Sequence, residues 1–275
     1  MKNIFETIKN FCTRTKDDEN RIMLYTPEEI AQDKTREDVW MVPYVVKDGA
    51  PVAVICPGGA YAMVSHHNEG TPFAQALNNA GHNAFVLNYR TGDAARYPNP
   101  MLDLARAIMF IRKHAAALGV DAQKLSIWGS SAAGHLCAYF SARHSLFDGE
   151  YMGEKITVEP QATVLVYPVV SLFEETHEGT RDNLLGKNAS EAERKDKSCD
   201  LIAGADYPPT FIMHCEDDGS VPVSNSKRLH AKLTSCGVKC NMHLYPTGGH
   251  GCGVAKGTSA EGWINTAIDF LNDTL

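Results

Sequence analysis

Residues 128–136 read Trp128-Gly-Ser-Ser-Ala-Ala-Gly-His-Leu136, directly after the apolar run Leu125-Ser-Ile127. A strand that breaks at Gly-x-Ser and restarts as an alanine-rich helix is the layout of a nucleophile elbow, a sharp turn that lifts a serine hydroxyl out of the sheet edge. In this register the nucleophile is Ser131, and the second glycine of the pattern is displaced, because Ala133 stands at its place and Gly134 follows. Alanine is small enough for the helix to pack closely on the strand. The alternative interpretation is a turn of small residues without chemistry.

The rest of the chain supports a strand–turn–helix arrangement around this segment, because short β-rich runs alternate with helical patterns from residue 51 onward. Such alternation is typical of βαβ units. We expect an α/β fold with a mainly parallel central sheet of about eight strands and helices on both faces. The expected strands are residues 21–26, 39–46, 51–56, 83–89, 124–128, 162–167, 210–215 and 241–245, the first two as an antiparallel edge pair, and the expected helices are residues 71–80, 101–118, 132–143, 223–236 and 259–271.

Two segments fall outside this alternation. Residues 1–20 place apolar side chains among Lys and Glu, which predicts a short amphipathic helix that packs on the body of the protein or on a second subunit. Residues 171–205 are polar and charged, and an insertion of this length after a strand is either a cap over a functional site or a solvated excursion. With 275 residues and 44% hydrophobic composition, we expect residues 1–275 to form a single domain.

Composition limits the partners. The net charge of −7 argues against nucleic acid or an anionic membrane as the main partner. No apolar stretch approaches the roughly 20 residues that span a bilayer. The eight cysteines show no short paired spacing of the zinc or redox type, although Cys252 near His250 and Cys215 beside His214 leave a metal site as a minor alternative. We therefore expect a reduced, cytoplasmic protein that needs no metal and no cofactor, with a homo-oligomer as one expected assembly.

A serine nucleophile needs a general base, and the base needs a group that fixes its tautomer. In folds of this kind, the acid and then the histidine follow the serine on loops after late strands. The predicted strand 210–215 leads into Glu216, Asp217 and Asp218, and the strand 241–245 leads into the glycine-rich loop around His250. Since carboxyl ends of parallel strands meet at one edge, we predict that Ser131, Asp218 and His250 form a triad there, with Asp217 as the second choice of acid.

Among the eleven histidines, His250 has glycines on both sides, which leave its ring unobstructed. His135 is the rival base, but it lies four residues after Ser131 within the predicted helix, and the elbow directs the serine away from that helix. His214 precedes the acid loop on its strand, and we expect it to orient that loop.

The oxyanion of an acyl-transfer intermediate is bound by backbone N–H groups. The predicted strand 51–56 ends in Pro57-Gly58-Gly59-Ala60-Tyr61, and two consecutive glycines let N–H groups turn toward one point. We predict Gly59, Ala60 and Ala132 as the donors. A phosphate-binding loop is a poor alternative, because the lysine and the Ser/Thr of that motif are missing.

These pieces together resemble an α/β-hydrolase of the acetyl xylan esterase-like group, which includes bacterial carbohydrate esterases and sugar-ester hydrolases. Two departures are Ala133 and Ala60, each in place of a glycine. The resemblance spans residues 50–270 in the order of the family. The matching residues are Cys56-Pro-Gly-Gly-Ala-Tyr61, Glu69-Gly70, Leu87-Asn-Tyr-Arg90, Tyr97-Pro-Asn-Pro-Met-Leu-Asp103, Gly129-Ser-Ser-Ala-Ala-Gly-His-Leu136, Pro208-Pro-Thr-Phe211, Asp218-Gly-Ser-Val-Pro222 and Gly248-Gly-His-Gly251.

The resemblance implies a serine carboxylesterase that hydrolyses short-acyl, acetyl-type esters of small sugars. Tyr61, His66 and His67 follow the oxyanion loop and are expected to line the pocket mouth, whereas Arg90 and Asp103 are expected to pair for structural reasons. Three alternatives remain: a general lipase-like carboxylesterase or amide-cleaving relative with the same triad, a non-catalytic binding module on this fold, and a cysteine hydrolase, which would need cysteine at position 131.

Overall fold

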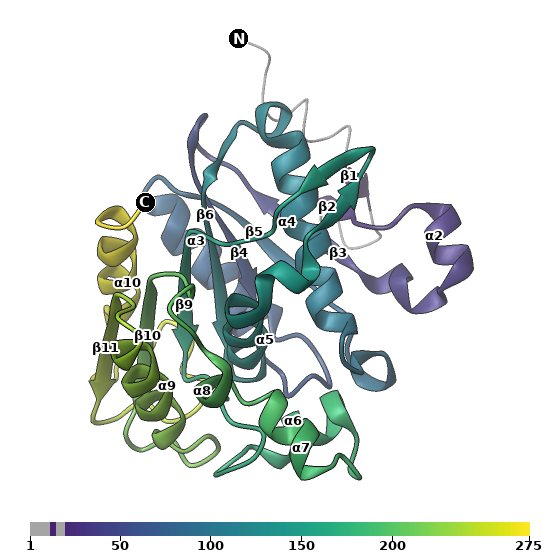
Figure 1. Ribbon diagram of the computed structural model, residues 1–275. Helices are drawn as coiled ribbons and strands as arrows, with labels where there is room; N and C mark the ends of the chain where they lie inside the picture. Colours follow the sequence, from purple (N-terminus) through teal and green to yellow (C-terminus); the bar gives the residue numbers. More distant parts are fainter. Residues whose placement is uncertain (1–11, 15–19) are drawn as a thin grey trace.

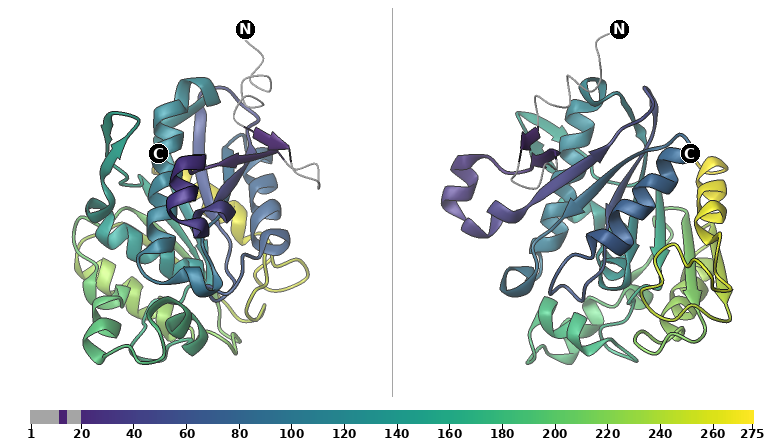
Figure 2. Two further views of the ribbon diagram at one scale, coloured as in Figure 1. Left: turned by 90° about the vertical axis from the view of Figure 1, so that its right-hand side faces the viewer. Right: turned by 180° about the vertical axis from the view of Figure 1, so that it is seen from behind.

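A nine-stranded sheet crosses the molecule in the order β1-β2-β3-β5-β4-β6-β9-β10-β11. The computed structural model describes residues 12–14 and 20–275 (Figures 1 and 2). The first three strands pair antiparallel with their neighbours, and the remaining six run parallel to one another. The bounds are β1 Cys12–Arg14, β2 Asn20–Met23, β3 Trp40–Tyr44, β4 Ala50–Cys56, β5 Asn83–Asn88, β6 Val120–Ser130, β9 Ala162–Val166, β10 Thr210–Cys215 and β11 Cys240–Tyr245.

Helices cover both faces of the sheet. On one face α4, α5 and α9 pack on β6, β9, β10 and β11, and on the other face α3 and α10 pack together against β5 and β10 (Figure 1). This arrangement explains why the inner strands are apolar on both sides, for example β9, in which every residue is buried. The predicted α/β fold is confirmed. The bounds are α2 Pro27–Gln32, α3 Thr71–Asn79, α4 Asn99–Leu118, α5 Ser131–Arg143, α9 Ser224–Ser235 and α10 Trp263–Asn272.

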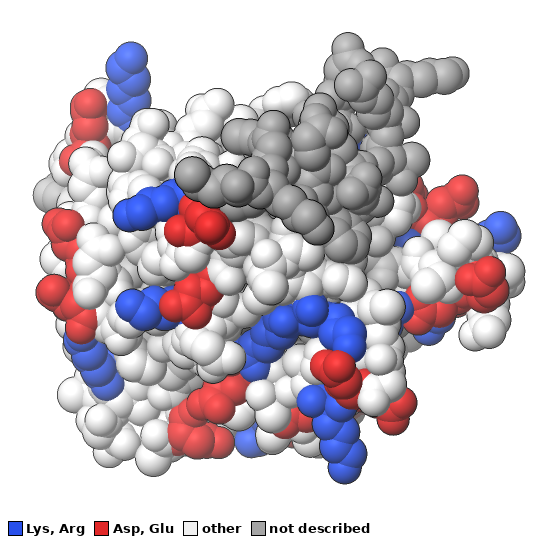
Figure 3. Space-filling model, turned by 90° about the horizontal axis from the view of Figure 1, so that it is seen from above, with Lys and Arg blue, Asp and Glu red and all other residues white. Residues whose placement is uncertain are grey.

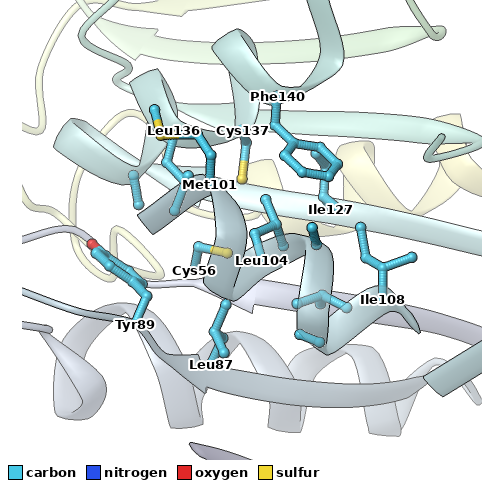
Figure 4. Close-up of a cluster of buried hydrophobic side chains, with 14 of the residues drawn as sticks. Cys56, Leu87, Tyr89, Met101, Leu104, Ile108, Ile127, Leu136, Cys137 and Phe140 are labelled. Atoms are coloured by element: carbon cyan, nitrogen blue, oxygen red, sulfur yellow. The ribbon is translucent and has the colours of Figure 1, made fainter. Parts of the chain in front are cut away.

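Two apolar layers lie on the two faces. The larger is built from β4, β5 and β6 against α4 and α5, where Leu104, Ile127 and Phe140 meet (Figure 4). The smaller contains Phe73, Trp128 and Trp263, whose rings contact one another. These layers fix the strand β6 and the helix α5 that carry the elbow.

Two features of the structure differ from, or add to, the sequence prediction. Residues 12–14 form strand β1, so the predicted helix over residues 1–20 is wrong there; the remaining predicted helical residues 1–11 and 15–19 lie outside the described residues. β1 pairs with β2, so backbone pairing with the sheet edge overrides the amphipathic pattern. A small hairpin of β7 Gly149–Tyr151 and β8 Glu154–Ile156 was also not predicted.

The insertion at residues 171–205 folds into three short helices, α6 Glu178–Leu185, α7 Glu191–Asp196 and α8 Cys199–Ile202. Ser190 and Glu193 form a reciprocal capping box at the start of α7. The helix α8 packs on α5 and α9, and α6 and α7 lie at the carboxyl edge of the sheet (Figure 1). The polar segment is therefore folded structure at the edge where the candidate site lies.

Charged side chains of both signs are interspersed on the ungreyed part of the face shown in Figure 3. In the interior, Arg90 and Asp103 form the predicted ion pair, with Nη2 2.8 Å from Oδ1. No helix within residues 12–14 and 20–275 is long and apolar enough to cross a bilayer.

Candidate active site

Ser131 stands at the junction between β6 and α5. Its φ of 53° lies in the left-handed region, which non-glycine residues adopt only when the surroundings enforce it. Two glycines allow the close approach: a Cβ at Gly129 would lie 2.1 Å from the carbonyl oxygen of Ala133, and one at Gly134 would lie 2.5 Å from Cβ of Pro168. The sharp turn thus has the geometry expected of a nucleophile elbow. Gly134, the displaced glycine of the motif, lies at the position where Pro168 leaves no room for a Cβ.

His250 lies in the loop that follows β11, and its Nε2 is 2.7 Å from Oγ of Ser131. Its Nδ1 is 2.7 Å from Oδ2 of Asp218. The Asp218 side chain is fully buried, and the His250 side chain is 20% exposed. The structure therefore brings together the alcohol, the imidazole and the carboxylate that the sequence analysis selected.

Asp218 is held by both carboxylate oxygens. Oδ1 accepts the backbone N–H groups of Ser220 and Val221, each at 2.9 Å, and Oδ2 receives His250 and, at 3.1 Å, Nε2 of His214. Burial alone would raise the pKa of Asp218, but the hydrogen bonds from His214, His250 and Val221 outweigh it and keep this pKa below its ordinary value. The group is consequently an anion that faces His250.

The neighbouring aspartate has a different place. Asp217 is exposed, and its oxygens accept the backbone N–H groups of Gly248 and Gly249 at 3.2 and 2.8 Å. It ties the acid loop to the histidine loop and makes no contact with the imidazole among the hydrogen bonds of the described chain. Of the two candidate acids, Asp218 is the one that the structure joins to His250.

The loop after β4 carries the candidate oxyanion donors. The carbonyl of Gly58 accepts Ser65 N–H at 2.9 Å, and the carbonyl of Gly59 accepts Ala62 N–H at 2.8 Å. In a trans peptide the N–H points opposite to the C=O. Because the carbonyls of Gly58 and Gly59 point toward residues of their own loop, the N–H groups of Gly59 and Ala60 point away from that loop. Neither N–H donates a hydrogen bond to another residue in the described part of the chain.

The same loop lies against the serine. A Cβ at Gly58 would be 2.9 Å from Cβ of Ser131. Ala132 is in the first turn of α5, where backbone N–H groups have no partner within the helix. The loop that carries Gly59 and Ala60 thus approaches Ser131 at Gly58, and Ala132 belongs to the same turn as Ser131.

Two of the three residues predicted to line the pocket mouth, Tyr61 and His66, have partners within the protein. Tyr61 is completely buried, and its hydroxyl is 3.1 Å from Nδ1 of His135. His66 stacks on Trp40, and its Nε2 is 2.9 Å from Oδ1 of Asn88, so it packs against the antiparallel edge of the sheet. His67 is beside it on the rim of a cavity of about 270 Å³ that none of the triad residues lines. The complete burial of Tyr61 argues against its expected place at the pocket mouth, whereas for His66 and His67 that expectation stays a prediction.

His135, the rival base, is also buried. Since its Nε2 donates to the carbonyl of Lys197 at 2.7 Å, its Nδ1 is left to accept the hydroxyl of Tyr61. Burial lowers the pKa of His135 to about 4. It joins α5 to the insertion and does not contact Ser131.

Several residues near the triad were missed by the sequence analysis. Nδ2 of Asn183, in the insertion, donates to the carbonyl of Ala60 at 2.8 Å. Glu69 accepts the N–H of Gly58, and Tyr167 contacts the ring of His250 with centroids 5.0 Å apart. Only Glu69 had a signal in the sequence, its place in the motif Glu69-Gly70; the other two are brought in by contacts between distant segments.

Metal ligands are not grouped in the described residues, among which no three His, Cys, Asp or Glu side chains could hold one ion. Seven cysteines, Cys56 to Cys252, are free thiols.

Comparison with known proteins places the chain in a family. The family model BD-FAE matches residues 38–233, which include β4, the elbow and the acid loop. The chain belongs to the BD-FAE family. BD-FAE proteins are α/β hydrolases, so the resemblance proposed from the motifs is confirmed at this level.

Two curated relatives of this BD-FAE chain are longer proteins. It is 34% identical over 214 residues to endo-1,4-beta-xylanase B of Butyrivibrio fibrisolvens, which covers 76% of this chain and 34% of the xylanase. It is 28% identical over 219 residues to an acetylxylan esterase of Xylanibacter ruminicola, covering 78% of this chain and 43% of the esterase. The chain thus spans a third to less than half of the length of these relatives.

Solved structures agree with the family assignment. An acetyl ester-xyloside bifunctional hydrolase from Caldicellulosiruptor lactoaceticus has a TM-score of 0.85 and 32% identity, covering 92% of this chain and 96% of that chain. A carboxylesterase from Lactobacillus plantarum has a TM-score of 0.72 and 25% identity, covering 85% of this chain and 92% of that chain. The BD-FAE chain shares its hydrolase fold with these two proteins over 92% and 85% of its length.

Proposed function

We propose that this chain is a serine carboxylesterase that removes acetyl-type groups from sugars. The observation that carries the proposal is the linked set Ser131 Oγ, His250 and Asp218, with both hydrogen bonds at 2.7 Å. Such a series of hydrogen bonds lets an imidazole take the serine proton while the carboxylate stabilises the imidazolium that forms. The names of the relatives support ester hydrolysis as the reaction.

In the proposed acylation step, Oγ of Ser131 attacks the ester carbonyl carbon and its proton moves to Nε2 of His250. The oxyanion that forms is met by the N–H groups of Gly59, Ala60 and Ala132. The C–O bond to the leaving sugar then breaks, and His250 returns the proton to the sugar oxygen. In deacylation, water loses a proton to Nε2 and attacks the acyl-serine, so acetate is released and Ser131 regains its proton.

Three features support a sugar as the alcohol part of the substrate. Relatives and a solved neighbour carry names that refer to acetylxylan and acetyl ester-xyloside. A polar cavity of about 510 Å³ lies on α6 and α7, lined among others by Arg96, Asn183 and Lys187. Asn183 also binds the carbonyl of Ala60, so this cavity adjoins the oxyanion loop. Polar and charged linings suit hydroxyl groups better than long acyl chains.

We propose residues 171–205 as the cap of this site. Besides Asn183, the segment contributes His177, the N-cap of α6, whose pKa is lowered by burial and by His250. The cytoplasmic location inferred from the cysteines stays a prediction.

The test compares wild-type protein with Ser131→Ala, and with Ser130→Ala as the matched control, because Ser130 is the adjacent serine of the same turn. The substrates are acetylated xylose, a long-chain aryl ester and an aryl amide, and labelling is followed with a fluorophosphonate probe. We expect wild type and Ser130→Ala to hydrolyse acetylated xylose and to be labelled at Ser131, and Ser131→Ala to do neither.

The other outcomes separate the alternatives. Faster turnover of the long-chain ester or of the amide would replace the sugar-ester assignment with a lipase-like or amide-cleaving one. A folded wild-type protein that is neither labelled nor active on any substrate would overturn the proposal in favour of a binding module.

A further inference from the structure

Glu69 is a buried carboxylate beside the triad that the proposed mechanism does not use. It belongs to the short π-helix η2, His66–Gly70, which follows the oxyanion loop, and it is only 4% exposed. Buried carboxylates are costly unless their oxygens receive hydrogen bonds. The hydrogen-bond partners of the Glu69 carboxylate therefore indicate its role.

Both oxygens of Glu69 receive donors from different elements. Oε2 accepts the N–H of Gly58 at 2.7 Å, and Oε1 accepts the hydroxyl of Tyr167 at 2.7 Å. Gly58 is the residue whose added Cβ would touch both Ser131 and this carboxylate, each at 2.9 Å. Glu69 thus lies directly behind the segment that presents the candidate oxyanion donors to the serine.

Tyr167 extends this contact to the histidine loop. Tyr167 directly follows β9. Its hydroxyl oxygen accepts the N–H of Gly253 at 3.3 Å, so the hydroxyl proton is donated to Glu69. The edge-on contact with His250, 5.0 Å between ring centroids, places the same phenol beside the imidazole. One buried carboxylate is consequently connected to the loop of the oxyanion donors and to the loop of the base.

The charge of Glu69 has no permanent counter-ion within the described chain, because no lysine or arginine there forms an ion pair with it. Burial is the largest influence and raises the pKa of Glu69 above its ordinary value, although the bonds from Tyr167 and Gly58 and the positive charge of protonated His250 act in the opposite direction. The titratable groups around Glu69 and His250 are Tyr89 after β5, Tyr167 after β9, Asp218 after β10, His177 in the insertion and Cys252 in the histidine loop.

We propose that Glu69 is a positioning residue of the esterase, one that fixes the oxyanion loop against the histidine loop and favours the positive charge that His250 acquires. The inference rests on the proposed function. Glu69 acts through Gly58 and Tyr167 and does not itself touch the reacting atoms. The carboxylate matters most when His250 carries the proton of Ser131, that is, in the transition state and not in the resting complex.

The decisive variant is Glu69→Gln, which keeps the side-chain shape but removes the charge and one acceptor. We expect kcat on acetylated xylose to fall between about tenfold and a hundredfold, with KM changed less than about twofold, since a hydrogen bond to a charged group is lost. The acid limb of the pH profile of kcat/KM should move to lower pH, because the imidazolium loses a nearby negative charge. A merely structural glutamate would not move that limb.

Two further variants complete the design. Tyr167→Phe keeps the ring beside His250 but removes the hydroxyl that connects Glu69 with Gly253, and we expect it to lower kcat as well. Glu261→Gln is the matched control: this exposed glutamate also accepts a glycine N–H, that of Gly257, at 2.9 Å, away from the triad. Its kcat and pH profile should equal those of wild type.

Thermal unfolding of each variant separates loss of the fold from loss of positioning. The inference would be overturned if Glu69→Gln unfolds like wild type and retains the wild-type kcat and pH profile. In that case hydrolysis by the wild-type protein would still support the proposed function. If Glu69→Gln does not fold, Tyr167→Phe decides by the same kinetic measurements. An inactive wild type would contradict the proposed function, and the inference that rests on it would fall with it.

Discussion

His214 and His250 make hydrogen bonds to the same oxygen of Asp218, with Nε2 of His214 at 3.1 Å and Nδ1 of His250 at 2.7 Å from Oδ2. His214 is buried at the end of β10, and its Nδ1 is 2.7 Å from Oγ of Ser226. Because the other oxygen of Asp218 is filled by the N–H groups of Ser220 and Val221, every acceptor position of this carboxylate faces a donor. A rotation of the Asp218 carboxylate, or the replacement of one of its oxygens, would therefore disturb the hydrogen bond to His250.

Asp218→Asn should reduce kcat by about 10⁴-fold, the loss known for the equivalent change in a serine protease. The amide oxygen must stay on the Ser220 and Val221 N–H groups, so the NH₂ group faces His250 Nδ1. Nδ1 of His250 then has to accept a hydrogen bond from the amide, so the imidazole proton moves to Nε2. A protonated Nε2 cannot accept the proton of Ser131. Steady-state hydrolysis of an acetyl ester measures the effect.

Asp217→Asn is the control for this prediction, because an amide oxygen can still accept Gly248 and Gly249 N–H. A loss in Asp218→Asn no larger than in Asp217→Asn would contradict the role assigned to Asp218.

The candidate triad could be found from the sequence because each member sits in a local pattern that carries its own signal. Gly129 and Ser131 mark a strand-to-helix turn, and glycines around His250 mark an open loop after a strand. The order of parallel strands then requires their carboxyl ends to meet at one edge, so the structure adds distances to an arrangement that the topology already implies.

What the sequence did not reveal depends on contacts between segments far apart in the chain. Asn183 is a polar residue in a charged insertion, and nothing around it indicates that its amide binds Ala60, 123 positions earlier. Tyr61 follows the oxyanion loop, which suggested a substrate contact, but the buried acceptor at His135 draws its hydroxyl inward. Pairing partners of this kind are set by tertiary packing and not by local periodicity.

Asn183→Ala should lower kcat about three- to tenfold, the scale of one neutral hydrogen bond. Its amide holds the carbonyl of Ala60, a residue with φ of 56° that is strained outside glycine. Without that bond the loop can relax and turn its N–H groups away from the oxyanion. Kinetics on an acetyl ester measure the loss, and Glu191→Ala, at an exposed residue of the same insertion that does not line the 510 Å³ cavity, should behave as wild type. Equal rates in all three proteins would show that the insertion does not influence the loop.

His135 makes stability depend on pH. Burial lowers its pKa from an ordinary 6.5 to about 4, so between these values the unfolded chain binds more protons than the folded one. Stability should fall as pH falls from about 6.5 to about 4, by an amount on the order of 3 kcal/mol from this group. His135→Gln can still bond to Tyr61 and Lys197 and does not titrate. Urea unfolding at several pH values should give a flatter dependence for the variant, and parallel curves would refute the assignment.

Gly134→Ala should destabilise the protein by more than about 2 kcal/mol, since an overpacked core commonly costs 1–3 kcal/mol and here the neighbour is rigid. The added Cβ would lie 2.5 Å from Cβ and 2.6 Å from Cα of Pro168, so the proline and with it the segment after β9 must move. Gly149→Ala is the matched control, because its Cβ would come closest to the flexible methyl end of Met109, at 3.2 Å, and would otherwise meet only the carbonyl oxygen of Phe147 at an ordinary 4.0 Å. Urea denaturation compares the two. Equal stability of the two variants would mean that position 134 has room for a Cβ, so that close packing against Pro168 would not explain the glycine there.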